Sequence, residues 1–303
     1  MPASVTHSFP HKMRSAPACK TVILTDARGG PRLADISEHS FILPDGLACH
    51  YLSCGSGAPI VLLHGGGSRA SNFAEVMTRL GERHAVHAPD LRGFGATQAL
   101  PGAAITHELW AQDTISLLDH LGLDRVHLVG WSLGATVALN VAARRPERVA
   151  AIALLGAPHP DKSMNRAYFE ERLRLFREAA DPATVIDHFL PMITTMLAPG
   201  TLERRPQALA QIRAEQIAAA PCAAAVTRAF DGRPDFATVL PRVTCPVTLI
   251  VGEADRTCDL AGAQAMAARL AQATVKVLPD CGHYFAMEQP EATAAALAHA
   301  FAA

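Results

Sequence analysis

The sequence lacks an excess of charge of either sign, and it lacks a long apolar segment. Its 303 residues contain 27 Lys and Arg against 28 Asp and Glu, so the net charge is -1 with neutral histidines. This balance provides no electrostatic attraction to nucleic acid or to an anionic membrane. A membrane-spanning helix requires about 20 mostly apolar residues, and runs such as Val149–Leu155 are far shorter. We therefore expect a soluble protein that binds neither nucleic acid nor a membrane.

Paired cysteines and a secretory signal are also missing. The seven cysteines form no Cys-x-x-Cys pair and stand at positions 19, 49, 54, 222, 245, 258 and 281. An odd, unpaired set favours reduced thiols in a cytoplasmic protein. Residues 1–36 contain no apolar run of about 7 to 15 residues, which a signal peptide requires, and we interpret them as a tail that is poorly ordered or lies along the surface. Cys258 and Cys281 fall in loops near the predicted site, where burial is a more common role than chemistry.

Half of the residues are hydrophobic and 18% are charged, which excludes disorder and favours one large or two small globular domains. Short β-rich runs alternate with longer helical patterns, and this order indicates crossover connections. The predicted fold class is α/β, with a mostly parallel sheet covered by helices on both faces. Two runs, 41–43 and 47–52, flank the turn residues Pro44-Asp45-Gly46 and predict an antiparallel hairpin at the start of the sheet. Buried strands are predicted at 59–63, 85–88, 126–129, 149–155, 247–251 and 274–278. Helices are predicted at about 71–80, 105–121, 133–144, 260–270 and 290–302.

The strand pattern stops between residues 157 and 240. This stretch predicts helices at 164–179, 184–197 and 206–219, interrupted by prolines. We interpret it as a helical cap inserted between two strands. A lid over a pocket is the favoured role, and a purely structural cover is the alternative. The predicted organisation is a tail over 1–36, a core over 37–156 and 241–303, and the cap over 157–240.

A candidate nucleophile lies in the pentapeptide Gly130-Trp131-Ser132-Leu133-Gly134. The motif follows the apolar run 126–129 directly and precedes the helical run 135–144, which is the context of a nucleophile elbow. The flanking glycines remove the Cβ atoms that would collide in such a sharp turn. Ser132 is therefore predicted to project its Oγ above the sheet, beside the positive end of a helix.

The loop His64-Gly65-Gly66-Gly67 follows another predicted strand. In folds with a nucleophile elbow, the loop at this position supplies the second N–H group of the oxyanion hole. The backbone N–H groups of Gly66 and Leu133 are the predicted oxyanion hole. His64 precedes this hole, and we expect it to fix the loop by hydrogen bonds.

Ser132 requires an imidazole to take its proton and a carboxylate to orient that imidazole. His283 is the candidate base, because it follows the last predicted strand and the turn 279–282. Asp255 is the candidate acid, in the loop after strand 247–251. Glu253 remains as a helper or a surface charge, and Asp259 is expected in the first turn of the next helix.

These residues together resemble the α/β-hydrolase superfamily over about residues 41–303, with an eight-stranded sheet and a cap inserted at the expected place. The segments 90–95 (DLRGFG) and 288–291 (EQPE) also look like the superfamily, and we expect both to be structural. A serine at position 132 argues against the epoxide hydrolases and haloalkane dehalogenases, which need a carboxylate there.

Two subfamilies share features with the chain. The elbow resembles that of the pimeloyl-ester carboxylesterases, with Ala135 in place of a frequent glycine. The His-Gly-Gly-Gly loop resembles that of the meta-cleavage-product hydrolases, which break carbon–carbon bonds, although Trp131 and Tyr284 depart from their pattern. We expect a serine esterase that acts on a small-molecule ester with a small to medium apolar acyl group. A carbon–carbon bond hydrolase and a non-catalytic ligand-binding protein remain as alternatives.

No metal or organic cofactor is expected, since the spacing of His84 and His87 is a weak metal signal. Trp131 and Tyr284, which neighbour the candidate nucleophile and base, are predicted to contact substrate. Met192 and Met196 are predicted to line the acyl pocket, although they and the neighbouring apolar residues of this helix equally fit the cap's own core. Four cap arginines occupy helical positions where charges are normally solvated: Arg166, Arg172, Arg174 and Arg177. An arginine directed into the pocket would favour the carbon–carbon hydrolases, whose dienoate substrates are acidic.

Overall fold

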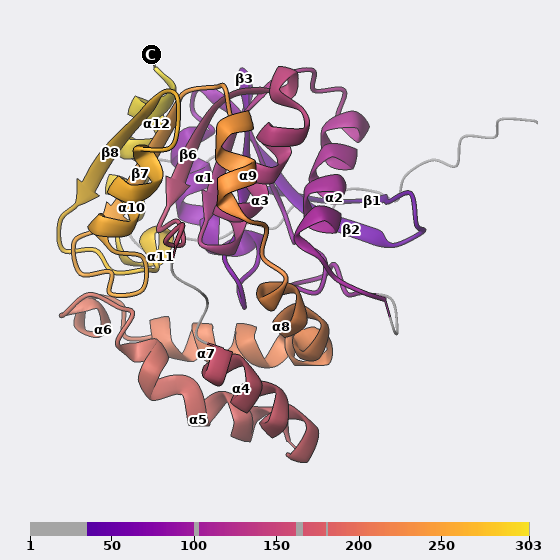
Figure 1. Cartoon of the computed structure of the whole chain (residues 1–303), viewed down its shortest axis with the longest axis vertical. Helices are drawn as coiled ribbons and strands as arrows, with labels where there is room; N and C mark the ends of the chain where they lie inside the picture. Colours follow the sequence, from indigo (N-terminus) through magenta and orange to yellow (C-terminus); the bar gives the residue numbers. More distant parts are fainter. Residues whose placement is uncertain (1–34, 100–102, 162–165, 180, 303) are drawn as a thin grey trace, which may run out of the picture.

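The computed structural model describes residues 35–99, 103–161, 166–179 and 181–302. The predicted tail lies outside these residues, apart from its last two. In the described part, an open sheet is flanked by helices on both faces, and a separate group of helices lies beyond one end of its strands (Figure 1).

The eight-stranded sheet is mostly parallel, as the sequence predicts. Its strands are β1 (Ser37–Ile42), β2 (Ala48–Cys54), β3 (Ala58–Leu63), β4 (His84–Pro89), β5 (Val126–Trp131), β6 (Val149–Leu155), β7 (Val247–Gly252) and β8 (Ala273–Leu278). The spatial order is β1-β2-β4-β3-β5-β6-β7-β8. β1 and β2 form the predicted hairpin, in which Leu43 N–H donates to Leu47 O over 2.8 Å. Gly46 has a φ of +88° in this turn, a conformation that glycine adopts without steric cost.

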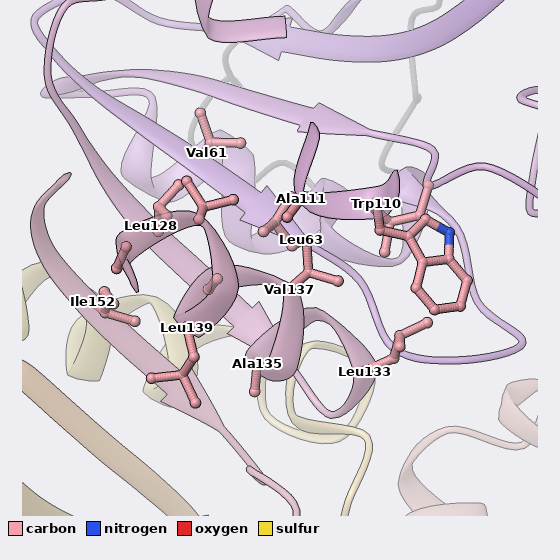
Figure 2. Close-up of a cluster of buried hydrophobic side chains, with 14 of the residues drawn as sticks. Val61, Leu63, Trp110, Ala111, Leu128, Leu133, Ala135, Val137, Leu139 and Ile152 are labelled. Carbon is pink, nitrogen blue, oxygen red and sulfur yellow. The ribbon is translucent and has the colours of Figure 1, made fainter. Parts of the chain in front are cut away.

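Helices cover the sheet in two layers. One layer packs α2 (His107–His120), α3 (Leu133–Arg144) and α10 (Leu260–Ala267) on one face. The opposite face is covered by the 3₁₀ turn η1 (Ala70–Phe73), α1 (Ala74–Leu80), α11 (Phe285–Glu288) and α12 (Pro290–Phe301). Figure 2 shows the first layer, in which Leu133, Val137 and Leu139 of α3 lie among residues of β3, β5 and β6. Because α3 is buried on nearly every side, its position is fixed from all directions.

The chain between β6 and β7 is helical. It forms α4 (Arg166–Glu178), α5 (Pro182–Thr194), α6 (Thr201–Arg204), α7 (Ala208–Ala218), α8 (Ala223–Asp231) and α9 (Phe236–Val239), with 3₁₀ turns at Ala220–Cys222 (η3) and Leu240–Arg242 (η4). The predictions located α4, α5 and α7, whereas α6, α8 and α9 were missed. Helices α4, α5, α7 and α8 lie together below the sheet in Figure 1. By contrast, Phe236, Val239 and Leu240 pack into the core cluster that contains α3.

Within the described residues, no helix combines the length and apolar character that crossing a membrane demands. Six cysteines belong to this part of the chain, and all six are free thiols.

Candidate active site

Ser132 occupies a strained turn between β5 and α3. Its φ is +53° and its ψ is -109°, a backbone conformation that costs about 1 to 3 kcal/mol in a residue other than glycine. The flanking glycines allow close packing here: a Cβ on Gly130 would lie 2.3 Å from Gly134 O, and one on Gly134 would lie 2.0 Å from Leu63 O. The sequence therefore folds into the sharp strand-to-helix turn that the motif predicts.

His283 and Asp255 form a buried pair. The Nδ1 atom of His283 lies 2.7 Å from Oδ2 of Asp255, and the two residues are 3% and 4% exposed. The other carboxylate oxygen of Asp255 accepts the backbone N–H groups of Thr257 (2.8 Å) and Cys258 (3.0 Å). Both oxygens are thus engaged, and the carboxylate is held in one orientation.

The end of β6 brings Ser132 next to this pair. Ser132 N–H donates to Leu155 O over 3.0 Å. Gly156, the residue after Leu155, packs so closely on the pair that a Cβ on it would lie 3.1 Å from both Oδ2 of Asp255 and Nδ1 of His283. Three loops that are distant in the sequence therefore meet at one point.

The loops exclude the alternative acids. Glu253 is exposed and its carboxylate accepts the N–H of Asp280 over 3.2 Å. Asp259 is the N-cap of α10 and accepts the N–H of Gly262 over 2.8 Å, close to the first-turn position expected for it. Of the three acidic candidates, the structure places Asp255 against His283.

The environment of His283 acts on its pKa in opposite directions. Burial disfavours the imidazolium, but the negative charge of Asp255, the hydrogen bond to it and a hydrogen bond to Cys258 outweigh that effect and raise the pKa of His283 above its usual value. When Nδ1–H donates to Asp255, the lone pair of Nε2 is the one left to accept a proton from a nucleophile.

The predicted oxyanion donors lie in two different loops. Leu133 is the first residue of α3, so its N–H has no acceptor four residues earlier and lies at the positive end of the helix. Gly66 lies in the loop after β3, under a ring of the inserted segment: a Cβ on Gly66 would come within 2.5 Å of Cζ of Phe230. Gln216 packs in the same way on Gly67, which has a φ of +73°. Phe230 and Gln216 therefore cover the predicted oxyanion loop.

His64 holds this loop in the way the sequence predicts. Its Nε2 accepts the N–H of Leu91 over 2.9 Å, so Nδ1 carries the proton and donates to Gly65 O over 2.8 Å. Complete burial lowers the pKa of His64, because the charged form loses its hydration. A neutral imidazole with both nitrogens in hydrogen bonds suits a structural role.

The buried carboxylate of Glu288, which we expected to be structural, holds the loop of the candidate base on both sides of His283. Glu288 accepts hydrogen bonds from the backbone N–H groups of Gly282 (3.2 Å), Tyr284 (2.9 Å) and Ala198 (2.8 Å). It also accepts one from the side-chain hydroxyl of Thr201 (2.7 Å). These donors come from the His283 loop and from the inserted segment. A glutamate before proline resembles an ordinary helix start, so the sequence carries no signal for this network.

The predicted substrate-contacting residues take different positions. The indole N–H of Trp131 donates to His283 O over 2.7 Å, and its ring lies 5.2 Å from that of Tyr284 in an edge-on arrangement. Met196 contributes its carbonyl oxygen, which accepts the N–H of His283 over 2.8 Å. Met192 is 41% exposed, because α5 turns Val185, Ile186, Phe189 and Ile193 inward. The placement of Met192 in the acyl pocket stays a prediction, and its exposure equally leaves it outside the cap's own core.

Arg172 departs from the expectation that the cap arginines are solvated. Its guanidinium donates to Tyr168 Oη (2.9 Å) and to Gln216 Oε1 (2.8 Å) and lies 5.4 and 6.0 Å from the ring centres of Phe176 and Phe189. Within the described residues, no carboxylate forms an ion pair with it. Arg174, on the same helix, is exposed and pairs with Glu171 at 2.7 Å. Arg172 is thus a cation held by neutral partners.

The charge of Arg172 also reaches the neighbour of the candidate base. Burial raises the pKa of the Tyr284 phenol, as do the negative charge of Glu215 and the nearby Tyr168, whereas Arg172 opposes this rise. Arg172 and Tyr168 of α4 therefore lie near Tyr284, and Gln216 of α7 lies against Gly67.

A cavity of about 550 Å³ opens elsewhere, between the end of α5, α6 and the loop after β7. Leu197, Glu203 and Arg256 are among its lining residues. Glu253 also lines it, whereas Ser132, Asp255 and His283 do not.

Comparison with known proteins agrees with the fold described above. The sequence model of the alpha/beta hydrolase family matches residues 60–296. A pimeloyl-[acyl-carrier protein] methyl ester esterase of Aromatoleum aromaticum is 32% identical over 254 residues, which cover 77% of this chain and 93% of that protein. A 2-hydroxy-6-oxo-2,4-heptadienoate hydrolase of Pseudomonas putida is 40% identical over 119 residues, which cover 38% of this chain and 43% of that protein. The chain thus spans less than half of the second relative.

The fold has solved counterparts as well. A thermophilic esterase from Thermogutta terrifontis superposes with a TM-score of 0.75 and 29% identity, covering 86% of this chain and 95% of the esterase. The family match extends over more than half of the sequence, and the eight-stranded sheet and the turn at Ser132 accord with it. This chain therefore belongs to the alpha/beta hydrolase family of enzymes.

Proposed function

We propose that this protein is a serine hydrolase that cleaves carboxylic esters with a small to medium apolar acyl group. The observation that carries the proposal is the buried 2.7 Å contact between His283 and Asp255, packed on Gly156 next to the strained turn at Ser132. This is the arrangement that activates a serine hydroxyl for acyl transfer. The six free thiols support the further expectation that it works in the reducing cytoplasm.

The chemistry follows in two halves. Ser132 Oγ attacks the ester carbonyl while Nε2 of His283 takes the hydroxyl proton, and the N–H groups of Gly66 and Leu133 bind the oxyanion. The tetrahedral intermediate collapses, the alkoxide leaves with the proton from His283, and the acyl group stays on Ser132. Water then gives a proton to His283 and attacks the acyl-enzyme. As the acid leaves, His283 passes that proton to Ser132 Oγ, which restores the hydroxyl and the neutral imidazole. Each oxyanion donor is worth about 3 kcal/mol in such a transition state.

The inserted segment supports an apolar acyl group. Phe230 lies against Gly66, and its ring stacks on that of Phe169 with 5.4 Å between centroids. An acyl chain on Ser132 would extend from the oxyanion loop towards these rings. Aromatic surface at this place favours a hydrocarbon chain of limited length.

A carbon–carbon bond hydrolase is the second candidate, and Arg172 is the observation that favours it. The guanidinium has neutral hydrogen-bond partners and aromatic rings beside it, so it retains the capacity to pair with a carboxylate. A dienoate product of ring fission carries such a carboxylate. The same Ser132, His283 and Asp255 would serve this reaction.

Covalent labelling tests for a competent nucleophile. A fluorophosphonate probe is expected to label the intact chain at Ser132, as located by mass spectrometry, and to leave Ser132→Ala unlabelled. Absence of labelling of the wild-type chain would favour the third possibility, a non-catalytic ligand-binding protein. A panel of p-nitrophenyl esters graded by acyl length then measures the preferred chain.

Arg172 distinguishes the two reactions. The kcat/KM values of medium-chain esters and of a dienoate ring-fission product are compared in wild type, Arg172→Met and Arg174→Met. Arg174 is the matched control, because it lies on the same helix but pairs with exposed Glu171. If the protein is an esterase, the neutral esters are the better substrates and Arg172→Met changes their kcat/KM little. A higher kcat/KM for the dienoate, lost only in Arg172→Met, would establish the carbon–carbon hydrolase.

A further inference from the structure

Cys258 adds a third metal-ligating group to the Asp255–His283 pair. One carboxylate oxygen of Asp255, Sγ of Cys258 and one ring nitrogen of His283 all lie within 4.8 Å of one another. The three residues are between 3% and 5% exposed. Among the described residues, no other group of three or more His, Cys, Asp or Glu side chains is arranged in this way.

The chemistry of this donor set matches a particular class of ion. Sulfur, imidazole nitrogen and carboxylate oxygen are the ligands that Zn²⁺ takes in proteins, at about 2.0 to 2.3 Å. Tetrahedral ligands at those lengths lie roughly 3.5 Å apart, whereas Nδ1 of His283 and Oδ2 of Asp255 lie 2.7 Å apart, so the three side chains have to rearrange slightly to admit an ion. Two of the ligands are already linked, because the N–H of Cys258 donates to Oδ1 of Asp255 over 3.0 Å.

We propose that Asp255, Cys258 and His283 form an inhibitory site for a thiophilic divalent cation such as Zn²⁺. The proposal rests on the function proposed above, in which His283 is the base. On binding, Cys258 gives up its S–H proton to solvent and becomes a thiolate ligand, and the ion takes a lone pair from one nitrogen of His283. The ion is neither reduced nor oxidised, and no bond to substrate is involved.

Either ring nitrogen leads to the same outcome. If the ion binds Nε2, the lone pair that would accept the Ser132 proton is used. If the ion binds Nδ1, the single remaining proton of the neutral ring lies on Nε2, which then has no lone pair to offer. In both cases the imidazole is no longer a base, so the bound protein is inactive although Ser132 is unchanged.

Cys281 provides a matched control. It is another fully buried thiol, two residues before His283, and it is not part of the three-residue group. A loss of metal sensitivity on replacing Cys258 but not Cys281 therefore separates this site from general reaction of the ion with thiols.

The first experiment titrates ZnCl₂ into the full chain after treatment with a chelator. The chelator alone is expected to leave the ester hydrolysis rate of metal-free protein unchanged. Micromolar Zn²⁺ is expected to inhibit wild type and Cys281→Ala alike, reversibly on adding chelator, and to require at least tenfold higher concentration in Cys258→Ala. Cys258→Val, which refills the volume of the side chain, serves if Cys258→Ala unfolds. Equal sensitivity of the Cys258 variants and wild type would overturn the proposal.

The second experiment reads the site without activity. Co²⁺ is expected to give a sulfur-to-cobalt charge-transfer band in wild type and in Ser132→Ala, and no such band in the Cys258 variants. Because Ser132→Ala is inactive under the proposed function, its band reports metal binding independently of catalysis. A missing band in wild type sinks the metal site while leaving the esterase proposal intact. If the band forms but the probe fails to label Ser132, the metal site is supported, whereas the esterase proposal and the inhibitory role that depends on it are both contradicted.

Discussion

Glu288 accepts hydrogen bonds from the backbone on both sides of His283. Its Oε1 takes the N–H of Tyr284 over 2.9 Å, and its Oε2 takes the N–H of Gly282 over 3.2 Å. The N–H of His283 itself donates to Met196 O. All three amides of this short loop are therefore fixed, two of them by a single buried carboxylate. The orientation of the candidate base depends on a side chain five residues later.

Replacing Glu288 by Gln should slow the reaction more than it weakens substrate binding. If the carbonyl of the amide stays with the three donors on Oε2, its NH₂ group meets the N–H of Tyr284, and one hydrogen bond to a charged acceptor, worth about 1.5 to 3 kcal/mol, is lost. We expect kcat to fall about tenfold or more and KM to change little. Thr201→Val is the control, since it removes one of the two bonds from the inserted segment and leaves both bonds from the His283 loop in place. An equal loss of kcat in both variants would contradict a role specific to the His283 loop.

Ser132→Ala, His283→Ala and Asp255→Asn should each lower turnover by several orders of magnitude without unfolding the protein. The three side chains act on one proton transfer, so double variants are expected to be far from additive. Steady-state kinetics with circular dichroism checks both statements. Glu253→Gln is the control, and a large loss in that variant with activity retained in Asp255→Asn would move the acid to Glu253.

The rate should rise with pH along a limb that lies above the usual pKa of histidine. Only the neutral imidazole accepts the serine proton, and Asp255 together with Cys258 raises the pKa of His283 in spite of its burial. The neutral fraction therefore grows with pH, and the half-maximal rate is reached above about pH 6.5. In Asp255→Asn the residual limb should move to lower pH, because the stabilising negative charge is gone. A kcat/KM that is flat from pH 5 to 8 would contradict the assignment of the base.

Phe230→Ala should shift the acyl preference towards longer chains. Its ring tip is the atom closest to a side chain built on Gly66, so truncation opens space above the predicted oxyanion loop. We expect the kcat/KM ratio of octanoate to butyrate esters to rise severalfold. Phe176→Ala, whose ring faces Arg172, is the comparison, and an identical shift in that variant would mean that general loosening of the inserted helices is responsible.

The sequence was sufficient for the sheet and insufficient for the contacts made by the inserted segment. Apolar runs predicted the six parallel strands, because burial in a parallel sheet imposes that pattern, and the turn residues 44–46 predicted the antiparallel pair β1 and β2. Helix α8 was missed because it is only nine residues long and follows the break that Pro221 marks, although its pattern is amphipathic. Phe230 and Gln216 were missed for another reason. Their partners, Gly66 and Gly67, are about 150 residues away in the sequence, and a local sequence pattern does not predict a contact over that separation. Arg172 looked solvated by its helical position, and its hydrogen bonds to Tyr168 and Gln216 make it different, together with the rings of Phe176 and Phe189.

The four donors to Glu288 also bear on how this protein can be recombined. Two come from the loop of His283, and two, Ala198 N and Thr201 Oγ1, come from the segment between β6 and β7. A chimera that receives a relative's inserted helices through junctions near residues 157 and 240 would leave this carboxylate buried with half of its donors missing. Exchange of the inserted segment to alter specificity is therefore best made with the Gly282–Glu288 stretch transferred from the same donor protein.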